Sequence, residues 1–194
     1  MPKSELPVLS FKSTKAWEAW LAKQPSGSGG VWVKFAKKNA GVPCVTKAAA
    51  IEGALCFGWI DGQLAPFDAA WFLTRFTPRT SRSKWSEINR AAALRLIDEG
   101  RMRPQGLLEI ERAKADGRWA VAYASQRTIE VPPDLARALK AQPKANAFFA
   151  TLDRVNRYAV LYRIHDAKKP ETRASRIAKF VDMLSRGERI HSKT

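Results

Sequence analysis

The densest group of side chains that could bind a ligand lies in residues 75–89, RFTPRTSRSKWSEIN. Basic side chains precede the one acid of this stretch, Glu87, and Ser and Thr hydroxyls are interspersed among them. If a strand ends here and a helix begins near Ser83, the free amides of the first helical turn would face these groups. Helix N-termini and arginines both bind anions, so the pattern predicts a phosphate or carboxylate site. The residues assigned to this predicted anion site are Arg75, Arg79, Arg82, Ser83, Lys84, Trp85 and Asn89.

The same stretch has a purely structural interpretation. Ser83 is a good N-cap residue, and the arginines around it could be solvated. The stretch also contains no glycine, so it is not the phosphate-binding loop GxxxxGK[ST]. An anion site and a structural loop therefore both stay open at this point.

Arg75 also enters a second prediction, because residues 59–67 and 71–77 read as two strands of a hairpin. A turn centred near Asp68 would place Asp61 directly opposite Arg75. The alternation along the second strand then puts Arg75 on the side of Trp71 and Leu73. A half-buried arginine needs a carboxylate, so the sequence predicts a structural ion pair between Asp61 and Arg75.

The last predicted helix is amphipathic and basic. Pro170 opens it, Gly187 closes it, and Ile177, Phe180, Val181 and Leu184 form an apolar stripe at helical spacing. Its charged face carries Arg173, Arg176 and Lys179. Such a face can bind an anionic membrane or DNA, but it is more often the solvated side of a packed helix.

The sequence contains no recognisable catalytic motif. GxSxG, HExxH and GxGxxG are all missing, and we expect no cofactor. The two cysteines, Cys44 and Cys56, form no CxxC pair, and with only two histidines we expect no metal site. We expect the cysteines to be free thiols. Enzymatic activity is thus unsupported, although an enzyme acting on a small anion near Arg75, Arg79 and Asn89 stays open.

The charge of the chain indicates the chemistry of its partners. With 34 basic and 18 acidic residues among 194, the formal net charge is +16, spread evenly over both halves. A charge of this size attracts polyanions such as nucleic acid, acidic lipid or an acidic protein surface. No segment is long and apolar enough to cross a bilayer, and no signal-peptide pattern is present, so we expect a cytoplasmic protein.

The order of the elements predicts an α+β protein whose C-terminal part is all-helical. Residues 31–38 alternate and read as a strand, and a helix follows from Thr46 with Gly58 as its C′ residue. Together with the hairpin, these elements predict a small antiparallel sheet with helices in a domain of residues 1–125. A seam at 131–133 then separates a helical domain of residues 131–194.

Several long motifs resemble one family. ALCFGWIDG, RFTPRTSRSKWSEIN, GRMRPQGLLEIERAKADGRW and AKKPETRASRIAKFVDMLSRGE are similar to segments of the YdeI/OmpD-associated family, also labelled bacteriocin-protection proteins. The resemblance implies a bacterial protein linked to stress and antimicrobial-peptide resistance, with no established reaction and no catalytic residues to transfer. It also implies that the first part is similar to small α+β domains, some of which are suspected of binding DNA.

These observations predict a non-enzymatic, stress- or peptide-resistance-type protein that binds an anionic ligand or an acidic protein. A nucleic-acid-binding module is the first alternative, and an enzyme on a small anionic substrate is the second. Direct capture of cationic peptides is disfavoured, because a surface of charge +16 repels them.

Overall fold

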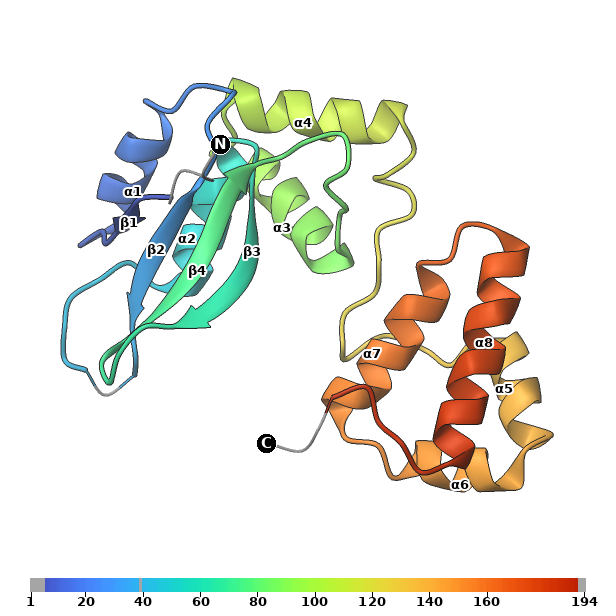
Figure 1. Cartoon of the computed structure of the whole chain (residues 1–194). Coiled ribbons are helices and arrows are strands. Elements are labelled where there is room, and N and C mark those ends of the chain that lie inside the picture. Colours follow the sequence, from blue (N-terminus) through green and yellow to red (C-terminus); the bar gives the residue numbers. More distant parts are fainter. Residues whose placement is uncertain (1–5, 39, 192–194) are drawn as a thin grey trace, which may run out of the picture. The chain divides into compact units, whose positions relative to one another are not determined.

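The computed structural model describes residues 6–38 and 40–191 and shows two compact units (Figure 1). The first contains the chain up to Trp85 together with Asn89–Ala122. The second contains Ser86–Ile88 together with the chain from Tyr123 onward. All strands of the four-stranded sheet lie in the first unit, whereas the second is built from helices.

The sheet of the first unit is mixed rather than antiparallel. Its strands are β1 (Val8–Leu9), β2 (Val31–Ala36), β3 (Trp59–Pro66) and β4 (Trp71–Pro78). Their order is β1-β2-β4-β3, with β1 parallel to β2 and the other pairs antiparallel. The α+β expectation is confirmed, but the expectation of an antiparallel sheet is wrong. A two-residue strand pairing in parallel leaves no hairpin pattern in the sequence, which is why β1 was missed.

One face of this sheet packs against helices. Along β2, Val31, Val33 and Phe35 are buried and alternate with half-buried residues. The buried side chains join a core with helices α1 (Thr14–Leu21) and α2 (Lys47–Cys56), centred on the fully buried Trp17. In Figure 1, α2 lies behind the sheet and no helix of this unit crosses in front of it.

The end of α2 and its connection to β3 were predictable from the position of Gly58 in the sequence. Thr46 caps α2 by accepting a hydrogen bond from the amide of Ala49, and Gly58 follows the helix with a φ of 73°. A left-handed residue at C′ reverses the chain, and glycine adopts it without steric cost. The predicted C′ role of Gly58 is therefore confirmed, and it feeds the chain directly into Trp59 of β3.

Two further helices complete the first unit: α3 (Glu87–Asp98), which belongs to it from Asn89 onward, and α4 (Pro104–Ala115). They share a second core with the end of α2. Its buried members are Leu55, Cys56, Trp85, Ala93, Leu96, Ile110 and Ala113. Burial of Trp85 in this core fixes the loop that joins β4 to α3.

The second unit is a bundle of four helices: α5 (Pro133–Lys140), α6 (Pro143–Ala150), α7 (Arg154–His165) and α8 (Pro170–Ser185). The predicted apolar stripe of α8 is confirmed, because Ile177, Phe180, Val181 and Leu184 are all buried in the core of this unit. The apolar side of this helix is therefore occupied within the unit.

Candidate functional site

The loop between β4 and α3 does not have the geometry predicted for an anion site. The helix begins at Glu87, four residues after Ser83. The Ser83 hydroxyl instead accepts a hydrogen bond from the amide of Thr80 at 2.9 Å, and the Ser83 amide donates back to the Thr80 carbonyl. Ser83 thus closes a tight turn, and the predicted N-cap role is wrong.

Arg79 is part of the structure of this loop. Arg79 is only 5% exposed, and its guanidinium carbon lies 3.6 Å from the centroid of the Trp85 ring. One of its nitrogens donates to the carbonyl oxygen of Lys84 at 3.2 Å. A guanidinium that stacks on an aromatic ring and bonds the backbone is oriented by the protein itself.

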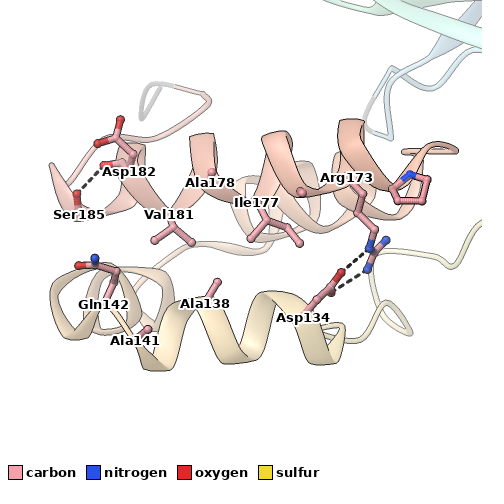
Figure 2. A pocket seen from close by; sticks show the side chains of 12 residues that line it. Asp134, Ala138, Ala141, Gln142, Arg173, Ile177, Ala178, Val181, Asp182 and Ser185 are labelled. Atoms are coloured by element: carbon pink, nitrogen blue, oxygen red, sulfur yellow. Dashed lines mark hydrogen bonds and ion pairs between the residues drawn. The ribbon is translucent and has the colours of Figure 1, made fainter.

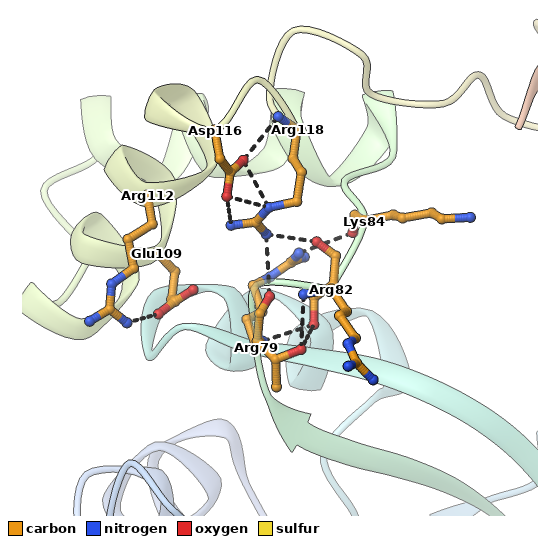
Figure 3. A network of polar contacts seen from close by, with 9 residues as sticks. Arg79, Arg82, Lys84, Glu109, Arg112, Asp116 and Arg118 are labelled. Carbon is orange, nitrogen blue, oxygen red and sulfur yellow. Dashed lines mark hydrogen bonds and ion pairs between the residues drawn. The ribbon is translucent and has the colours of Figure 1, made fainter. Parts of the chain in front are cut away.

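A residue that the sequence did not single out organises the same loop. Arg118 donates hydrogen bonds to the carbonyl oxygens of Thr80 at 3.3 Å and of Ser83 at 2.8 Å, and it pairs with Asp116 at 2.7 Å (Figure 3). The loop therefore directs carbonyl oxygens at a cation, which is the opposite of what an anion would need. Arg118 lies 35 residues from Ser83, so only the three-dimensional structure reveals the contact.

The remaining residues of the predicted anion site are dispersed. Arg82 and Lys84 are exposed, and Figure 3 shows Arg82 pointing away from the Arg118 network. Trp85 is 2% exposed and packs edge-on against Trp119, and Asn89 lies within α3. The structure brings Arg79 and Trp85 together, but it does not gather the seven predicted residues around one cavity.

The predicted ion pair between Asp61 and Arg75 is also wrong. Asp61 pairs with Phe76 across β3 and β4, and the register shifts between Asp61 and Leu64. Because neighbouring residues of a strand point to opposite faces, Asp61 shares the face of Phe76 and Arg75 lies on the other. Within residues 6–38 and 40–191, no carboxylate forms an ion pair with Arg75.

Arg75 instead belongs to the face of the sheet that α1 and α2 leave uncovered. It pairs with Trp32 of β2, and Lys34 pairs with Leu73. These side chains therefore lie side by side on one surface. With the aromatic residues at the β3–β4 hairpin they form what we term the open face: Trp32, Lys34, Phe67, Trp71, Leu73 and Arg75. Within it, Leu73 is only 9% exposed and the Nε atom of Arg75 is buried.

The aromatic rings of the open face hold a lysine. The Lys34 ammonium lies 4.1 Å from the centroid of the Phe67 ring and 5.0 Å from that of Trp71. Phe67 is 48% exposed, and Trp32 and Trp71 are half-buried. A cation resting on exposed rings is held by only about 0.5–1 kcal/mol, so Lys34 is free to exchange partners.

The charge around the open face is positive. Among the described residues, neither Lys34 nor Arg75 forms an ion pair. Lys37, at the end of β2, donates from its ammonium to the backbone carbonyl of Asp68 at 2.8 Å. The nearest acid of the hairpin is Asp68, whose carboxylate accepts hydrogen bonds from the amides of Ala70 and Trp71 at 2.8 Å. An anion approaching the open face therefore meets cations that no carboxylate of the described chain neutralises.

A separate hollow of about 590 Å³ lies at the end of β2, lined by aromatic residues of the helix-covered face of the sheet. Phe35 and Phe72 stack against each other in its wall, and Lys37, Lys38 and Lys47 lie along it. Cys44 is also there, with its sulfur accepting a hydrogen bond from the amide of Ala36 at 3.3 Å. This end of the sheet thus combines apolar surface with further ammonium groups.

The basic helix α8 uses its arginines within the second unit. Arg173 makes a two-pronged ion pair with Asp134 and also donates to the Ile164 carbonyl, and Arg176 donates to the Arg163 carbonyl. The Arg173 guanidinium lowers the pKa of Asp134 to about 2. Lys179 is exposed. Two of the three predicted binding residues are therefore occupied by structural contacts.

A groove of about 730 Å³ runs between α5 and α8 (Figure 2). Its floor includes Ile177 and Val181, and the Asp134–Arg173 pair closes one end. At the other end, Asp182 is paired with Arg186. The acidic groups of the groove are thus already paired, and we assign no ligand to it.

Three other observations bear on cofactors and membranes. Within the described residues, no three His, Cys, Asp or Glu side chains are grouped so that they could hold a metal ion. Cys44 and Cys56 are both free thiols. No helix in residues 6–38 and 40–191 is long and apolar enough to cross a bilayer.

Comparison with protein families gives two matches, one on each side of the boundary between Ala122 and Tyr123. Residues 9–109, just over half of the chain, match the model described as Domain of unknown function (DUF8412). The chain belongs to the DUF8412 family. The open face and the loop at residues 79–86 both lie inside the DUF8412 match.

Residues 128–187 match a second model, described as Bacteriocin-protection, YdeI or OmpD-Associated. The expected resemblance to this family is confirmed, but it holds for the helical part and not for nearly the whole chain. Comparison of this DUF8412 member with curated proteins gave no significant match, and comparison with solved structures gave none either.

Proposed function

We propose that this protein is a non-enzymatic bacterial protective protein of the cytoplasm that acts by binding an anionic partner through the open face of its DUF8412 part. The match of residues 128–187 to the bacteriocin-protection family supports the protective role. The anionic nature of the partner follows from the charge of the chain and from the chemistry of the open face.

The observation that carries this proposal is the combination of Lys34 and Arg75 on an uncovered sheet face, neither of them paired with an acid among the described residues. Elsewhere in the molecule, many arginines are committed to carboxylates or to backbone carbonyls. Arg95 and Arg101 pair with Glu52, and Arg173 pairs with Asp134. An anion can bind neighbouring cations that form no ion pair without first breaking an internal ion pair.

The charge also argues against direct capture of cationic peptides. A formal net charge of +16 repels such peptides at long range, whereas it accelerates the approach of a polyanion. Protection would then arise from what the protein does to its anionic partner, not from sequestering the antimicrobial agent.

The test is binding of inorganic polyphosphate, a polyanion without bases, to the full chain at several salt concentrations. The informative variant is Lys34→Gln/Arg75→Gln. The matched control is Arg137→Gln/Lys140→Gln, which removes the same charge from exposed positions of α5. We expect the open-face variant to weaken binding about tenfold or more at low salt, and the control to change it by less than about threefold.

Equal losses in the two double variants would mean that net charge alone governs binding, and would overturn the assignment of the open face. Failure of the wild-type protein to bind polyphosphate at low salt would overturn the proposed function itself. Circular dichroism of each variant checks that the fold is retained.

A further inference from the structure

The open face offers more than charge, because its cations are interleaved with flat aromatic rings. Trp32 lies opposite Arg75, and Lys34 lies against Phe67 and Trp71. Phosphate groups need only the cations, and an acidic protein surface would not require rings. Bases of a nucleic acid use both, since every base has a flat face that stacks on an aromatic side chain.

We propose that the open face binds single-stranded nucleic acid, with Phe67, Trp71 and Trp32 stacking on bases and with Lys34 and Arg75 contacting phosphates. This inference rests on the proposed function, since it names the anionic partner of the same face. It goes beyond that function by assigning a separate role to the aromatic residues.

The spacing along the strands suits a chain of bases. Trp32 is aligned with Arg75, four residues along β4 from Trp71. At about 3.3 Å per residue, the two indole rings are roughly 13 Å apart along the strand direction. This distance exceeds the separation of two stacked bases, so the strand would have to be extended between the rings. Lys34 lies midway along this span and Arg75 lies at its Trp32 end, so both are placed to contact phosphates of the bound strand.

Lys34 would change partners when the strand binds. In the free protein its ammonium covers the rings of Phe67 and Trp71. A phosphate is a stronger partner for an ammonium than a ring, because a charge-assisted hydrogen bond is stronger than an exposed cation–π contact. Movement of Lys34 onto a phosphate would free ring surface for a base, so the two contacts would form together.

The shape of the site favours a single strand over a duplex. Bases within a double helix are already stacked on each other, and their faces are closed to side chains on a sheet. The open face also presents strands and not a projecting helix that could enter the major groove. A duplex would therefore contact only the cations, as polyphosphate does.

The experiment compares binding of a twelve-nucleotide single strand, the matching duplex and inorganic polyphosphate to the full chain. The variants are Phe67→Ala, Trp71→Ala and the conservative Trp71→Phe. Phe67 is half exposed, so Phe67→Ala keeps the test valid even if Trp71→Ala fails to fold. Val155→Ala, at an exposed position on α7, is the control.

We expect the single strand to bind at least tenfold more tightly than the duplex. Phe67→Ala and Trp71→Ala should weaken single-strand binding about tenfold, which corresponds to about 1.4 kcal/mol. Both alanine variants should bind polyphosphate within about twofold of wild type. Trp71→Phe should recover most of the single-strand affinity that Trp71→Ala loses. Quenching of tryptophan fluorescence by the single strand, reduced in Trp71→Phe, would report the stacking directly.

Equal affinity for single strand and duplex, with Phe67→Ala and Trp71→Ala unchanged, would overturn this inference while leaving the polyanion-binding function intact. If neither polyphosphate nor the single strand binds, the inference and the proposed function fail together. A third outcome is that only Lys34→Gln/Arg75→Gln weakens binding and that it weakens polyphosphate and single-strand binding equally. This outcome would overturn the role of the rings and assign the face to phosphate recognition alone.

Discussion

The side chain of Arg118 donates a 2.8 Å hydrogen bond to the carbonyl oxygen of Ser83 and holds the loop between β4 and α3 from a position 35 residues away. The same guanidinium bonds the Thr80 carbonyl and pairs with Asp116. The conformation of this loop, which is rich in Arg, Lys, Ser and Thr, is thus stabilised by a guanidinium from outside the loop. This relationship explains why the loop presents carbonyl oxygens at its centre.

Arg118→Ala should destabilise the protein by about 2–4 kcal/mol, because two carbonyls lose a charged donor in a partly buried site. Arg118→Lys should recover only part of this, since an ammonium lacks the planar fork. Chemical denaturation measures the free energy of unfolding of both variants. Lys114→Ala, which breaks only an exposed pair with Glu111, should cost less than about 1 kcal/mol. Equal effects of Arg118→Ala and Lys114→Ala would show that the Arg118 contacts do not stabilise the loop.

Gly106→Ala should also be destabilising. A Cβ atom at this position in α4 would overlap the Cys56 carbonyl oxygen and lie 2.8 Å from that of Leu55. Alanine is normally the better helix residue by about 1 kcal/mol, but overpacking against backbone typically costs about 1–3 kcal/mol and allows no rotamer to relieve it. We expect a net loss of up to about 2 kcal/mol, measured by thermal or urea unfolding.

The control for this change is Gly27→Ala, where nothing lies within 4 Å of the added methyl group and the backbone is not left-handed. Its stability should stay within about 0.5 kcal/mol of wild type. A Gly106→Ala protein as stable as the Gly27→Ala protein would contradict the close approach of α2 and α4.

The Asp134–Arg173 pair should make the free energy of unfolding depend on pH in the acidic range. The pKa of Asp134 is lowered to about 2, chiefly by its hydrogen bonds with Arg173, from an ordinary value near 3.9 in an unfolded chain. The stabilisation is therefore complete above about pH 4 and is lost as the pH falls toward 2. Since the Asp134 side chain is 34% exposed, solvent screening reduces the contribution to about 1 kcal/mol.

This dependence is measured by comparing the unfolding of wild type and Asp134→Asn between pH 2 and 7. The stability difference should be largest at neutral pH and shrink in acid. Asp98→Asn, at an exposed position on α3, is the control for removing one carboxylate from the surface. A difference for Asp134→Asn that is constant with pH would exclude ionisation of this carboxyl as its source.

The helical unit should fold by itself. Its apolar cluster runs from Ile129 to Ile190 and lies wholly within the chain after Tyr123. A fragment of residues 126–194 should therefore unfold cooperatively, as judged by circular dichroism at 222 nm. A fragment that starts at Pro132 loses Ile129 and Val131, which pack on this cluster, and should melt at a lower temperature. A fragment of residues 126–194 without a cooperative transition would show that the two units depend on each other.

Local features of the sequence predicted several elements well. Gly58 ends α2 in the left-handed conformation, and the four apolar residues of α8 are buried as their spacing indicates. These predictions rest on residues close together in the chain, where backbone preference and periodicity act directly. They hold because no distant contact opposes them.

Predictions that required exact pairing were less successful. The loop of the β3–β4 hairpin and the shift between Asp61 and Leu64 moved the register at Asp61 by one residue, which was enough to put Asp61 and Arg75 on opposite faces of the sheet. The start of α3 moved from Ser83 to Glu87 while Trp85 became buried against Trp119. The importance of Lys34 was missed because its ring partners, Phe67 and Trp71, come from the β3–β4 hairpin, which is distant from β2 in the sequence.

The irregularity between Asp61 and Leu64 has a second consequence, for the behaviour of the molecule at high concentration. β3 is an edge strand, so its outer backbone groups could pair with an edge of another copy. The break in register interrupts that row, and Pro66 removes one amide donor from the end of the strand. The feature that misled the prediction of an ion pair therefore helps to keep a sheet with an exposed aromatic surface from assembling into fibres.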